Sequence, residues 1–566
     1  MRRPTLGTAL WVAVAALLPL AFALGSLHRG HHGDQAIFRS WYDALRGAPS
    51  HMYVTARQDT EYPVLGVAVA VAPGFVAPAG AFGAAMKLLL VPWNALLILA
   101  FGGAARALRL PRPRATAVLF YLLPVTWVCA MYFGQIDGVV AALQLVVAWA
   151  GATVLEKAHG ERPVSAVHFV VGVLALQASL LTKQLAVLAA PGLIALLLLG
   201  LLGWHRAGHR RAAWIGLAGL VSSFAVLRLP DAFLTLPAGY HSHLALVFLG
   251  TGPSHSDMIG NAPGIFAFAH LAPDASSLDS RVLGMPAQSL GHRLFGVFAI
   301  VVTALFVRAV VRMLERREPQ ASLLARAALL YAGLCHLGVG LLIAGAHERH
   351  LFNAFPLLIL GLGGASFARG VKLVAWVAGA VYGVFVLSTI EWDAFAPVAI
   401  LRESRLSAAL SLVLLGVGMI EMMMRGRASE QQRLARPVPH QARDFGVFML
   451  IALSLVSVVA FRRGVTLPVA IVPAACGVLL SVFAIVRPAI VSPLAEAWAD
   501  LGYLLGRVTT PIVLAIVFAA VVVPLGLFMR ALGKDVLKLR RDASASTYWV
   551  ERKRRTFEPA DFERLS

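Results

Sequence analysis

The chain has 566 residues, of which 59% are hydrophobic and only 14% are charged, and its mean hydropathy is +0.77. This composition excludes a soluble globular protein of ordinary make-up. Apolar runs of about 18 to 23 residues recur along the chain, and each is long enough to cross a hydrocarbon core of roughly 30 Å as a helix. Because the runs are continuous rather than alternating, they predict helices and not a β-barrel. The expected fold class is an all-α polytopic integral membrane protein.

The formal net charge of +21 would suggest nucleic acid as the partner of a soluble protein. Here the basic residues lie in short loops between apolar runs, as the positive-inside bias requires. We therefore expect membrane lipids as partners and no nucleic acid. Arg2 and Arg3 place the N-terminus inside, and the later inner turns are marked by the basic loops 106–114, 206–211, 308–317 and 369–372.

Candidate membrane spans follow one another up to residue 424, near 7–27, 84–105, 115–132, 135–154, 165–182, 184–203, 212–228, 293–312, 323–345, 351–367, 371–389 and 407–424. The apolar stretch from Val64 to Ala81 is rich in proline and glycine, and treating it as a span would invert every later loop. We therefore expect it to be a partly embedded helix on the outer side. That side then receives segments 28–83, 229–291 and 390–406 and the turns at Phe133, Lys183 and His347.

Three parts are expected along the chain: a transmembrane domain at 1–424, a basic cytoplasmic linker at 425–443 and a C-terminal membrane domain at 444–566. Charged and proline residues in the linker are typical of a boundary between modules. The C-terminal domain has apolar runs at 446–461, 466–486 and 508–529 and a basic tail, 534–555. The number of crossings there, and so the side of the tail, stays open. The tail is expected either to anchor the chain at anionic lipid or to bind a cytoplasmic or membrane partner.

The polar residues expected on the outer side form four clusters: His28, His31, His32 and Asp34; Phe133 to Asp137; Lys183 and Gln184; and His347 to His350. Ionisable groups at a membrane boundary are costly, so they usually face a cavity and serve a function. Taken singly, Asp137 or Lys183 could equally be an interfacial helix cap. The only cysteines are Cys129, Cys335 and Cys476, each in an apolar run, and they indicate neither a disulfide framework nor a cysteine metal site.

The spacing of these motifs over residues 7–424 resembles the GT-C superfamily of membrane glycosyltransferases. The spacing resembles in particular the dolichyl-phosphate-glucose-dependent glucosyltransferases of N-glycan precursor assembly and their bacterial polyprenyl-phosphate-sugar relatives. Five motifs carry it: Gly33-Asp34 with the following aromatic stretch to Trp41-Tyr42, Glu61-Tyr62-Pro63-Val64-Leu65, Gly134-Gln135-Ile136-Asp137, Lys183-Gln184 and His347-Glu348-Arg349. Val64 departs from the family pattern, which has a second proline there. A second set of motifs lies in the C-terminal part: Arg443-Asp444-Phe445-Gly446, Leu504-Leu505-Gly506, Pro511, Pro524-Leu525-Gly526, Gly533-Lys534-Asp535 and Tyr548-Trp549. On these residues, the unit at roughly 440–562 resembles the small membrane proteins of the SxtJ type, a resemblance that implies no particular chemistry.

The resemblance implies that Asp34 is the general base that deprotonates the acceptor hydroxyl. One carboxylate can suffice, because a phosphate leaving group departs without an acid to protonate it, whereas glycoside hydrolysis normally needs two carboxylates. Direct displacement with a single base predicts inversion at the sugar carbon. Cations around the departing phosphate would stabilise the transition state more than the ground state.

The residues expected to bind the donor phosphate or sugar are Arg349, His347, Lys183, Glu348, His350, Gln135 and Asp137. Those expected at an acceptor or loop site are Glu61, Tyr62 and Asn261. Glu348 orients Arg349 or His347, or is only an intrahelical ion-pair partner, and Asn261 could be a turn residue before Pro263.

Two further interpretations concern metals and aromatics. We expect no resident cofactor and no metal site, and a divalent cation at His31 and His32 beside Asp34 is the alternative, although their spacing matches no defined metal motif. Trp41, Tyr42, Tyr53 and Tyr62 fit a belt at the membrane interface or a platform for a sugar, and the belt is the commoner arrangement.

The resulting hypothesis is an enzyme: an inverting GT-C-type hexosyltransferase at the inner membrane of a bacterium, with its active site on the periplasmic side. It takes a hexose from a polyprenyl-phosphate carrier and transfers it to a lipid-linked or envelope glycan. Two rivals stay open. One is a flippase or secondary transporter of lipid-linked sugars, which also uses charges within helices; the other is a membrane scaffold for a modifying enzyme.

Overall fold

The computed structural model describes residues 6–30, 32–55, 62–159, 166–237, 239–249, 264–268, 281–282, 284–315, 320–343, 349–363, 369–391, 404–425, 438–462 and 467–488, with Val491, Ala495, Phe518 and Val523. The chain forms two compact units, Met1–Trp498 and Ala499–Ser566. In the second unit only Phe518 and Val523 are described, so the fold that follows is that of the first.

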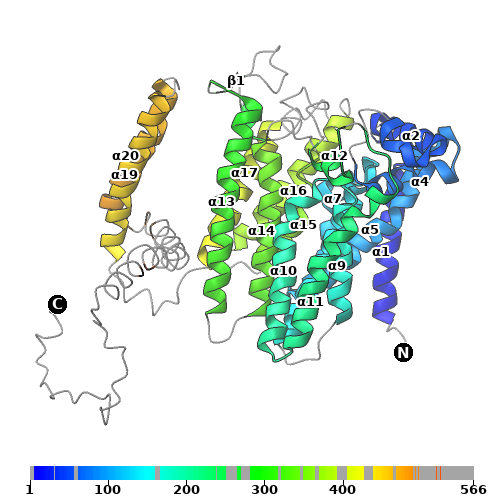
Figure 1. Cartoon of the computed structure of the whole chain (residues 1–566), viewed down its shortest axis with the longest axis horizontal. Helices are drawn as coiled ribbons and strands as arrows, with labels where there is room; N and C mark the ends of the chain where they lie inside the picture. The colour runs from blue at the N-terminus through cyan, green and yellow to red at the C-terminus, as the bar shows by residue number, and fades with distance from the viewer. Residues whose placement is uncertain are drawn as a thin grey trace, which may run out of the picture. The chain divides into compact units, whose positions relative to one another are not determined.

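Within the described residues, eight helices are long and apolar enough to cross a membrane. They are α1 (Leu6–Gly25), α5 (Phe82–Ala107), α8 (Asp137–His159), α10 (Ala186–Arg206), α11 (Arg210–Ser223) with its 3₁₀ continuation η5 (Phe224–Ala232), α13 (Ala287–Leu314), α14 (Ala321–Leu342) and α17 (Ser404–Arg425). Helices α8 and α14 are the most buried, whereas α1, α11 and α13 mostly face outward. The predicted fold class, an all-α multi-pass membrane protein, is thereby confirmed (Figure 1).

The predicted span 115–132 is a broken one. It consists of α6 (Pro113–Leu122), α7 (Pro124–Trp127) and the π-helical segment η4 (Val128–Tyr132), and the two halves are bent by 65°. Leu123, between them, has an extended backbone (φ −60°, ψ 133°), because a residue before proline is disfavoured in the α region. The break directs η4 toward the start of α8.

Three further helices overlap predicted spans: α9 (Ala166–Leu180), α15 (Ala354–Leu362) and α16 (Arg369–Ile390). At nine residues, α15 is roughly 14 Å long, too short to cross a bilayer. All nine are buried, chiefly against α14. This helix is therefore part of the protein core, and its continuous hydrophobicity reflects burial in protein rather than contact with lipid.

Between α1 and α5 the chain forms a cap, comprising α2 (His32–Gly47), η1 (Pro49–His51), α3 (Met52–Thr55), α4 (Val64–Val76) and η3 (Ala79–Ala81). Figure 1 shows α2 and α4 side by side at one end of α1 and α5, which we call the cap end. The sequence prediction of a helix after Val64 is confirmed, and its 13 residues are too few for a full span.

The cap is held by close packing between its two main helices. Phe38 and Trp41 lie on the buried face of α2, and Gly74 of α4 lies so close to the Tyr42 ring that a Cβ there would be 2.4 Å from it. Leu65 N–H, at the start of α4, donates to the carbonyl of Leu181 at 2.8 Å. The cap is thus attached to the turn between α9 and α10.

The remaining elements are short or lie near the C-terminus: α12 (His243–Leu249), η6 (Ile265–Phe268), the antiparallel pair β1 (Arg281–Val282) and β2 (Met285–Pro286), in which Arg281 is opposite Pro286, and the helices α19 (Val438–Arg462) and α20 (Leu467–Val486). Helices α19 and α20 pack along each other, and Ser481 Oγ donates to the carbonyl of Gly446 at 2.7 Å.

The start of α19 lies inside the predicted linker 425–443. Pro439 is its second residue, where proline is tolerated, so this proline starts a helix rather than marking a loop.

Candidate functional site

Four charged residues form a continuous chain of alternating sign at the cap end. Lys183 Nζ lies 2.8 Å from Asp137 Oδ1, Arg349 Nε lies 3.9 Å from Asp137 Oδ2, and Arg349 Nη1 lies 3.7 Å from Asp34 Oδ2. All four residues are at most 9% exposed. These residues belong to four separate sequence motifs, and the structure places them in one cluster, which we call the charge chain.

Both carboxylates are positioned at helix N-termini. Asp34 lies in the first turn of α2, and Asp137 is the first residue of α8. The positive end of a helix dipole favours a negative group there. The cations come from turns, because Lys183 connects α9 to α10 and Arg349 precedes α15. Each ion pair therefore joins a helix start to a loop that only the folded bundle can bring near it.

The Lys183–Asp137 pair is the most deeply buried part of the cluster. Burial acts to lower the pKa of the Lys183 ammonium, but the Asp137 carboxylate acts to raise it, and the net direction is upward. The Lys183 ammonium also lies over the ring of Tyr62, 5.3 Å from its centroid. We therefore expect Lys183 to stay charged and to position Asp137, with Arg349 more directly available to a ligand.

Tyr62, predicted at an acceptor or loop site, instead contacts the residues predicted to bind the donor. Its phenol donates to Gln135 Oε1 at 3.4 Å, and its ring packs against Trp41 with centroids 5.2 Å apart. Tyr53, behind it, donates to the Tyr62 carbonyl at 2.8 Å. Trp41, Tyr42 and Tyr53 are at most 8% exposed, so the interpretation of these three as an interfacial belt is wrong. They form the buried aromatic support of the cap.

The long segment after α11 reaches this support through α12. His243 is buried, and its Nε2 lies 3.1 Å from the phenolic oxygen of Tyr53. Since that phenol already donates to Tyr62, His243 Nε2 carries the proton and donates. Burial lowers the pKa of His243, with a smaller opposing effect from Asp231, so the imidazole stays neutral.

Two buried polar residues of α5, Lys87 and Asn94, were not predicted as functional. Lys87 Nζ donates to the carbonyls of Ser26 and Tyr132, the latter at 3.0 Å, and Asn94 Nδ2 donates to the carbonyl of Ala130 at 3.0 Å. Ala130 and Tyr132 belong to the π-helical segment that precedes Asp137, and π-bulges are frequent at functional sites. Lys87 therefore joins the segment before Asp34 to the segment before Asp137. A lysine inside an otherwise apolar run was the available signal.

His336 of α14 is the third residue that the sequence interpretation missed. It is 1% exposed, and its Nε2 donates to the carbonyl of His350 at 2.9 Å. This bond fixes the turn that carries Arg349. His350 itself was predicted to bind the donor and lies in this turn, partly buried.

A cavity of about 620 Å³ lies beside the N-terminal half of α2. Its lining includes the polar side chains of His28, Gln35, Arg39 and Asp43, and its other residues are Leu27, Ala36, Gly80, Ala81, Phe82, Gly83 and Ala84. Gln35 directly follows Asp34, and its amide lies so close to Gly83 that a Cβ there would be 2.3 Å from Oε1. The cavity therefore lies beside α2, and its lining includes Gln35, the residue next to Asp34, but none of the four residues of the charge chain.

Several predicted site residues lie outside the described part of the chain: His31, Glu61, Asn261, His347 and Glu348, and also the side chain of His32. Among the described residues, no group of three histidine, cysteine, aspartate or glutamate side chains is arranged to hold a metal ion. Cys129 and Cys335 are buried, and neither forms a disulfide within the described residues. The described part of the candidate site thus consists of the charge chain, its aromatic support and the cavity beside α2.

Comparison of the chain with protein-family models, with curated proteins and with solved structures finds no match in any of the three. Chemically, the site offers a buried carboxylate, Asp34, with the Arg349 guanidinium beside it, and a polar cavity whose lining includes the next residue, Gln35. Such a pair can accept a proton from a hydroxyl and stabilise a nearby phosphate.

Proposed function

We propose that the protein is an inverting glycosyltransferase that transfers a hexose from a polyprenyl-phosphate carrier to a lipid-linked or envelope glycan. The observation that carries the proposal is the juxtaposition of Asp34 and Arg349, whose Oδ2 and Nη1 atoms lie 3.7 Å apart at one end of a membrane bundle. Transfer from a lipid phosphate needs a base for the acceptor hydroxyl and a cation for the leaving phosphate, close together and near the membrane surface.

Arg349 is the expected phosphate-binding residue because its guanidinium forms a planar fork that can engage two phosphate oxygens. It lies over the ring of Phe133, with the guanidinium carbon 5.2 Å from the ring centroid, and Asp137 approaches its Nε at 3.9 Å. Both contacts restrain the Arg349 guanidinium. Restrained charges that already point at the reacting group require little reorganisation during the reaction.

The reaction is a single displacement. Asp34 takes the proton of the acceptor hydroxyl, the acceptor oxygen forms a bond to the anomeric carbon, and the bond from that carbon to the phosphate oxygen breaks. The electron pair of the broken bond leaves with the polyprenyl phosphate, whose added negative charge is stabilised by Arg349. Because the new bond forms opposite the one that breaks, the configuration at the anomeric carbon inverts.

The charge chain also brings the proposed base and the proposed phosphate-binding residue together. Arg349 is shared between Asp34 and Asp137, so a phosphate that engages this guanidinium does so beside Asp34. The same pair of residues thereby places the donor phosphate close to the acceptor hydroxyl.

The cavity beside α2 supports an acceptor site. Its lining has an amide, a guanidinium and a carboxylate, which are side chains that can hydrogen-bond sugar hydroxyls, and it includes Gln35, the residue after Asp34. In this arrangement the acceptor enters along α2 and the donor phosphate approaches from Arg349.

We further propose that the cap end faces the outside of a bacterial inner membrane, in keeping with the basic residues of the loops at the other end.

The main rival is a flippase for lipid-linked sugars, and the position of the charges favours an enzyme. Transporter sites usually lie near the bilayer midplane, whereas Asp34 and Asp137 lie at helix starts and Lys183 and Arg349 in turns. Vesicles that contain the purified protein and a polyprenyl-phosphate hexose distinguish the two. A new glycosidic bond on an added acceptor lipid fraction supports the transferase, and translocation of the carrier without any new bond refutes it.

A further inference from the structure

At the end of the bundle opposite the cap, three buried arginines donate to backbone carbonyls at the C-terminal ends of helices. Arg425 Nη2 donates to Gly361 O at 2.8 Å, and Arg308 Nη1 donates to Met423 O at 3.1 Å. Arg326 donates to the carbonyl of Leu108, just after α5. Each contact places a cation at the negative end of a helix dipole, which is favourable. Together the three arginines also concentrate positive charge in a small buried volume.

The positive charge of this cluster exceeds the negative charge around it. Among the described residues, Glu421 supplies the carboxylate of this cluster, and its Oε1 lies 2.9 Å from Arg425 Nε. Arg326 and Arg425 lie close enough to repel each other. Among the described residues, Arg326 Nε and Arg425 Nη1 have no hydrogen-bond partner although both atoms are buried. Since a buried, unsatisfied N–H of a charged group is costly, the cluster would be stabilised by an anion with acceptor oxygens.

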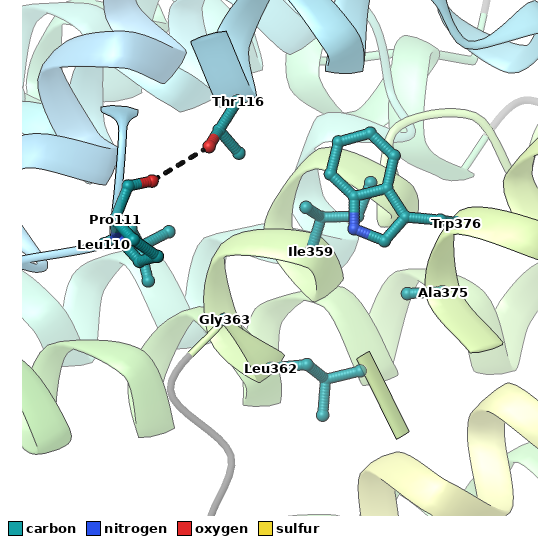
Figure 2. A pocket seen from close by; sticks show the side chains of 8 residues that line it. All are labelled: Leu110, Pro111, Thr116, Ile359, Leu362, Gly363, Ala375 and Trp376. Carbon is teal, nitrogen blue, oxygen red and sulfur yellow. Dashed lines mark hydrogen bonds between the residues drawn. The ribbon is translucent and has the colours of Figure 1, made fainter. Parts of the chain in front are cut away.

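An apolar pocket of about 200 Å³ adjoins this cluster. Figure 2 shows its lining, in which the Thr116 hydroxyl donates to the carbonyl of Pro111 at 3.1 Å. The pocket and the cluster are built on the same two segments, because residues 108–111 and 361–363 supply both the carbonyls bound by arginine and part of the pocket wall. The volume is below the range of about 300 to 1,000 Å³ of sites for drug-sized ligands, so it suits a length of hydrocarbon chain rather than a whole ligand.

We propose that this end of the bundle binds an anionic phospholipid, with one acyl chain in the pocket between α6, α15 and α16 and the headgroup phosphate at Arg326 and Arg425. An amphiphile fits because the apolar pocket and the excess positive charge lie together at a helix end, where the headgroup region of a bilayer meets the hydrocarbon core. Basic pockets between membrane helices are an established type of site for anionic headgroups. The site is separate from the charge chain and does not depend on the proposed transferase activity.

The test uses the full-length protein in detergent, with phosphatidylglycerol and phosphatidylcholine of the same acyl chains as probes and native mass spectrometry and thermal unfolding as readouts. We expect phosphatidylglycerol to bind saturably and to raise the melting temperature more than phosphatidylcholine. Arg326→Gln should weaken phosphatidylglycerol binding by about fivefold, as expected for one basic residue near a headgroup. Arg206→Gln, an exposed arginine at the end of α10, is the matched control and should leave binding unchanged.

Filling the pocket tests the acyl chain separately and without removing a buried charge. Ala375, 1% exposed in the pocket wall, is changed to leucine, and Leu373→Phe on the exposed face of the same helix is the control. We expect weaker phosphatidylglycerol binding in Ala375→Leu only. Equal binding of the two lipids, or phosphatidylglycerol binding that neither Arg326→Gln nor Ala375→Leu reduces, would overturn the proposal. Full competition by glycerol phosphate would also overturn it, by showing that the site recognises the anion alone.

Discussion

Each residue of the charge chain has a neighbour of opposite sign, so the loss of one charge leaves another uncompensated. The strongest case is Lys183 with Asp137, whose side chains are 3% and 1% exposed. Coulomb attraction at 2.8 Å offsets the cost of burying both ions only while both are present. The pair therefore acts chiefly to hold Asp137 in place for Arg349.

We predict that Lys183→Met lowers the free energy of unfolding by about 3 to 5 kcal/mol, because it leaves a buried carboxylate without its closest cation. The double variant Lys183→Met/Asp137→Leu should recover most of that loss, since Arg349 keeps Asp34 as a partner. Chemical denaturation of the purified variants in detergent measures the free energy of unfolding of the single and the double variant. If the double variant is as unstable as the sum of the single ones, the two residues do not act as a pair.

At the level of residues, the sequence was most informative where a charge stands at the edge of an apolar run. Asp34, Asp137, Lys183 and Arg349 were all identified in this way, and the structure brings them together. Their pairing could not be predicted, because it depends on how helices far apart in the sequence pack. Lys87 was overlooked although its charge inside an apolar run was visible; its partners are backbone carbonyls, which have no signature in a sequence.

At the level of elements, the site depends on two connections that lie against each other. The connection from α1 to α2 leads to Asp34 in the first turn of α2, and the π-helical segment before α8 leads to Asp137. They lie close together at Gly30, where a Cβ would lie 2.5 Å from the Tyr132 carbonyl oxygen. Gly30 also has a φ of +110°, a backbone conformation that residues with a Cβ rarely adopt.

We predict that Gly30→Ala displaces Asp34 from Arg349 and lowers transfer activity by at least tenfold, with a stability loss of about 1 to 3 kcal/mol from backbone strain. Gly25→Ala is the matched control, because Gly25 ends α1 with nothing within 4 Å of an added Cβ. Activity and melting temperature are measured for both variants. Equal behaviour of the two would show that the close approach at Gly30 is not needed.

The helices themselves were largely predictable from hydropathy, and the exceptions have physical causes. The break at Leu123 and Pro124 follows from proline stereochemistry and could have been inferred from the sequence. The shortness of α15 could not, because a buried core helix and a membrane span have the same apolar composition. Hydropathy reports removal from water, and it does not say whether lipid or protein replaces the water.

For the whole molecule, the orientation that we propose depends on the distribution of charge. The charge chain and its cavity lie at the cap end, whereas basic residues such as Arg106, Arg206 and Arg312 lie in the last turns of α5, α10 and α13. The positive-inside bias then predicts that the cap end is external. The composition predicted the membrane class, but it carries no information on the side that faces outward.

We predict that, in a variant without the three native cysteines, His28→Cys reacts with a membrane-impermeant maleimide in intact spheroplasts. Arg206→Cys should react only after the membrane is permeabilised. Both positions are exposed in the structure, so a difference in labelling reports the side of the membrane and not burial. Reversed labelling would place the charge chain in the cytoplasm and rule out a donor on the outer leaflet.

The proposal that Asp34 is the base of a sugar transferase is tested most directly by single-turnover transfer from a radiolabelled polyprenyl-phosphate hexose, with donor binding measured in the same samples. Asp34→Asn keeps the size of the side chain and removes its proton-accepting charge. We expect this variant to bind the donor as the unaltered protein does and to transfer the hexose about 10² to 10⁴ times more slowly. Unchanged transfer by Asp34→Asn, in a protein that is folded and binds the donor, would contradict the assignment of Asp34 as the base.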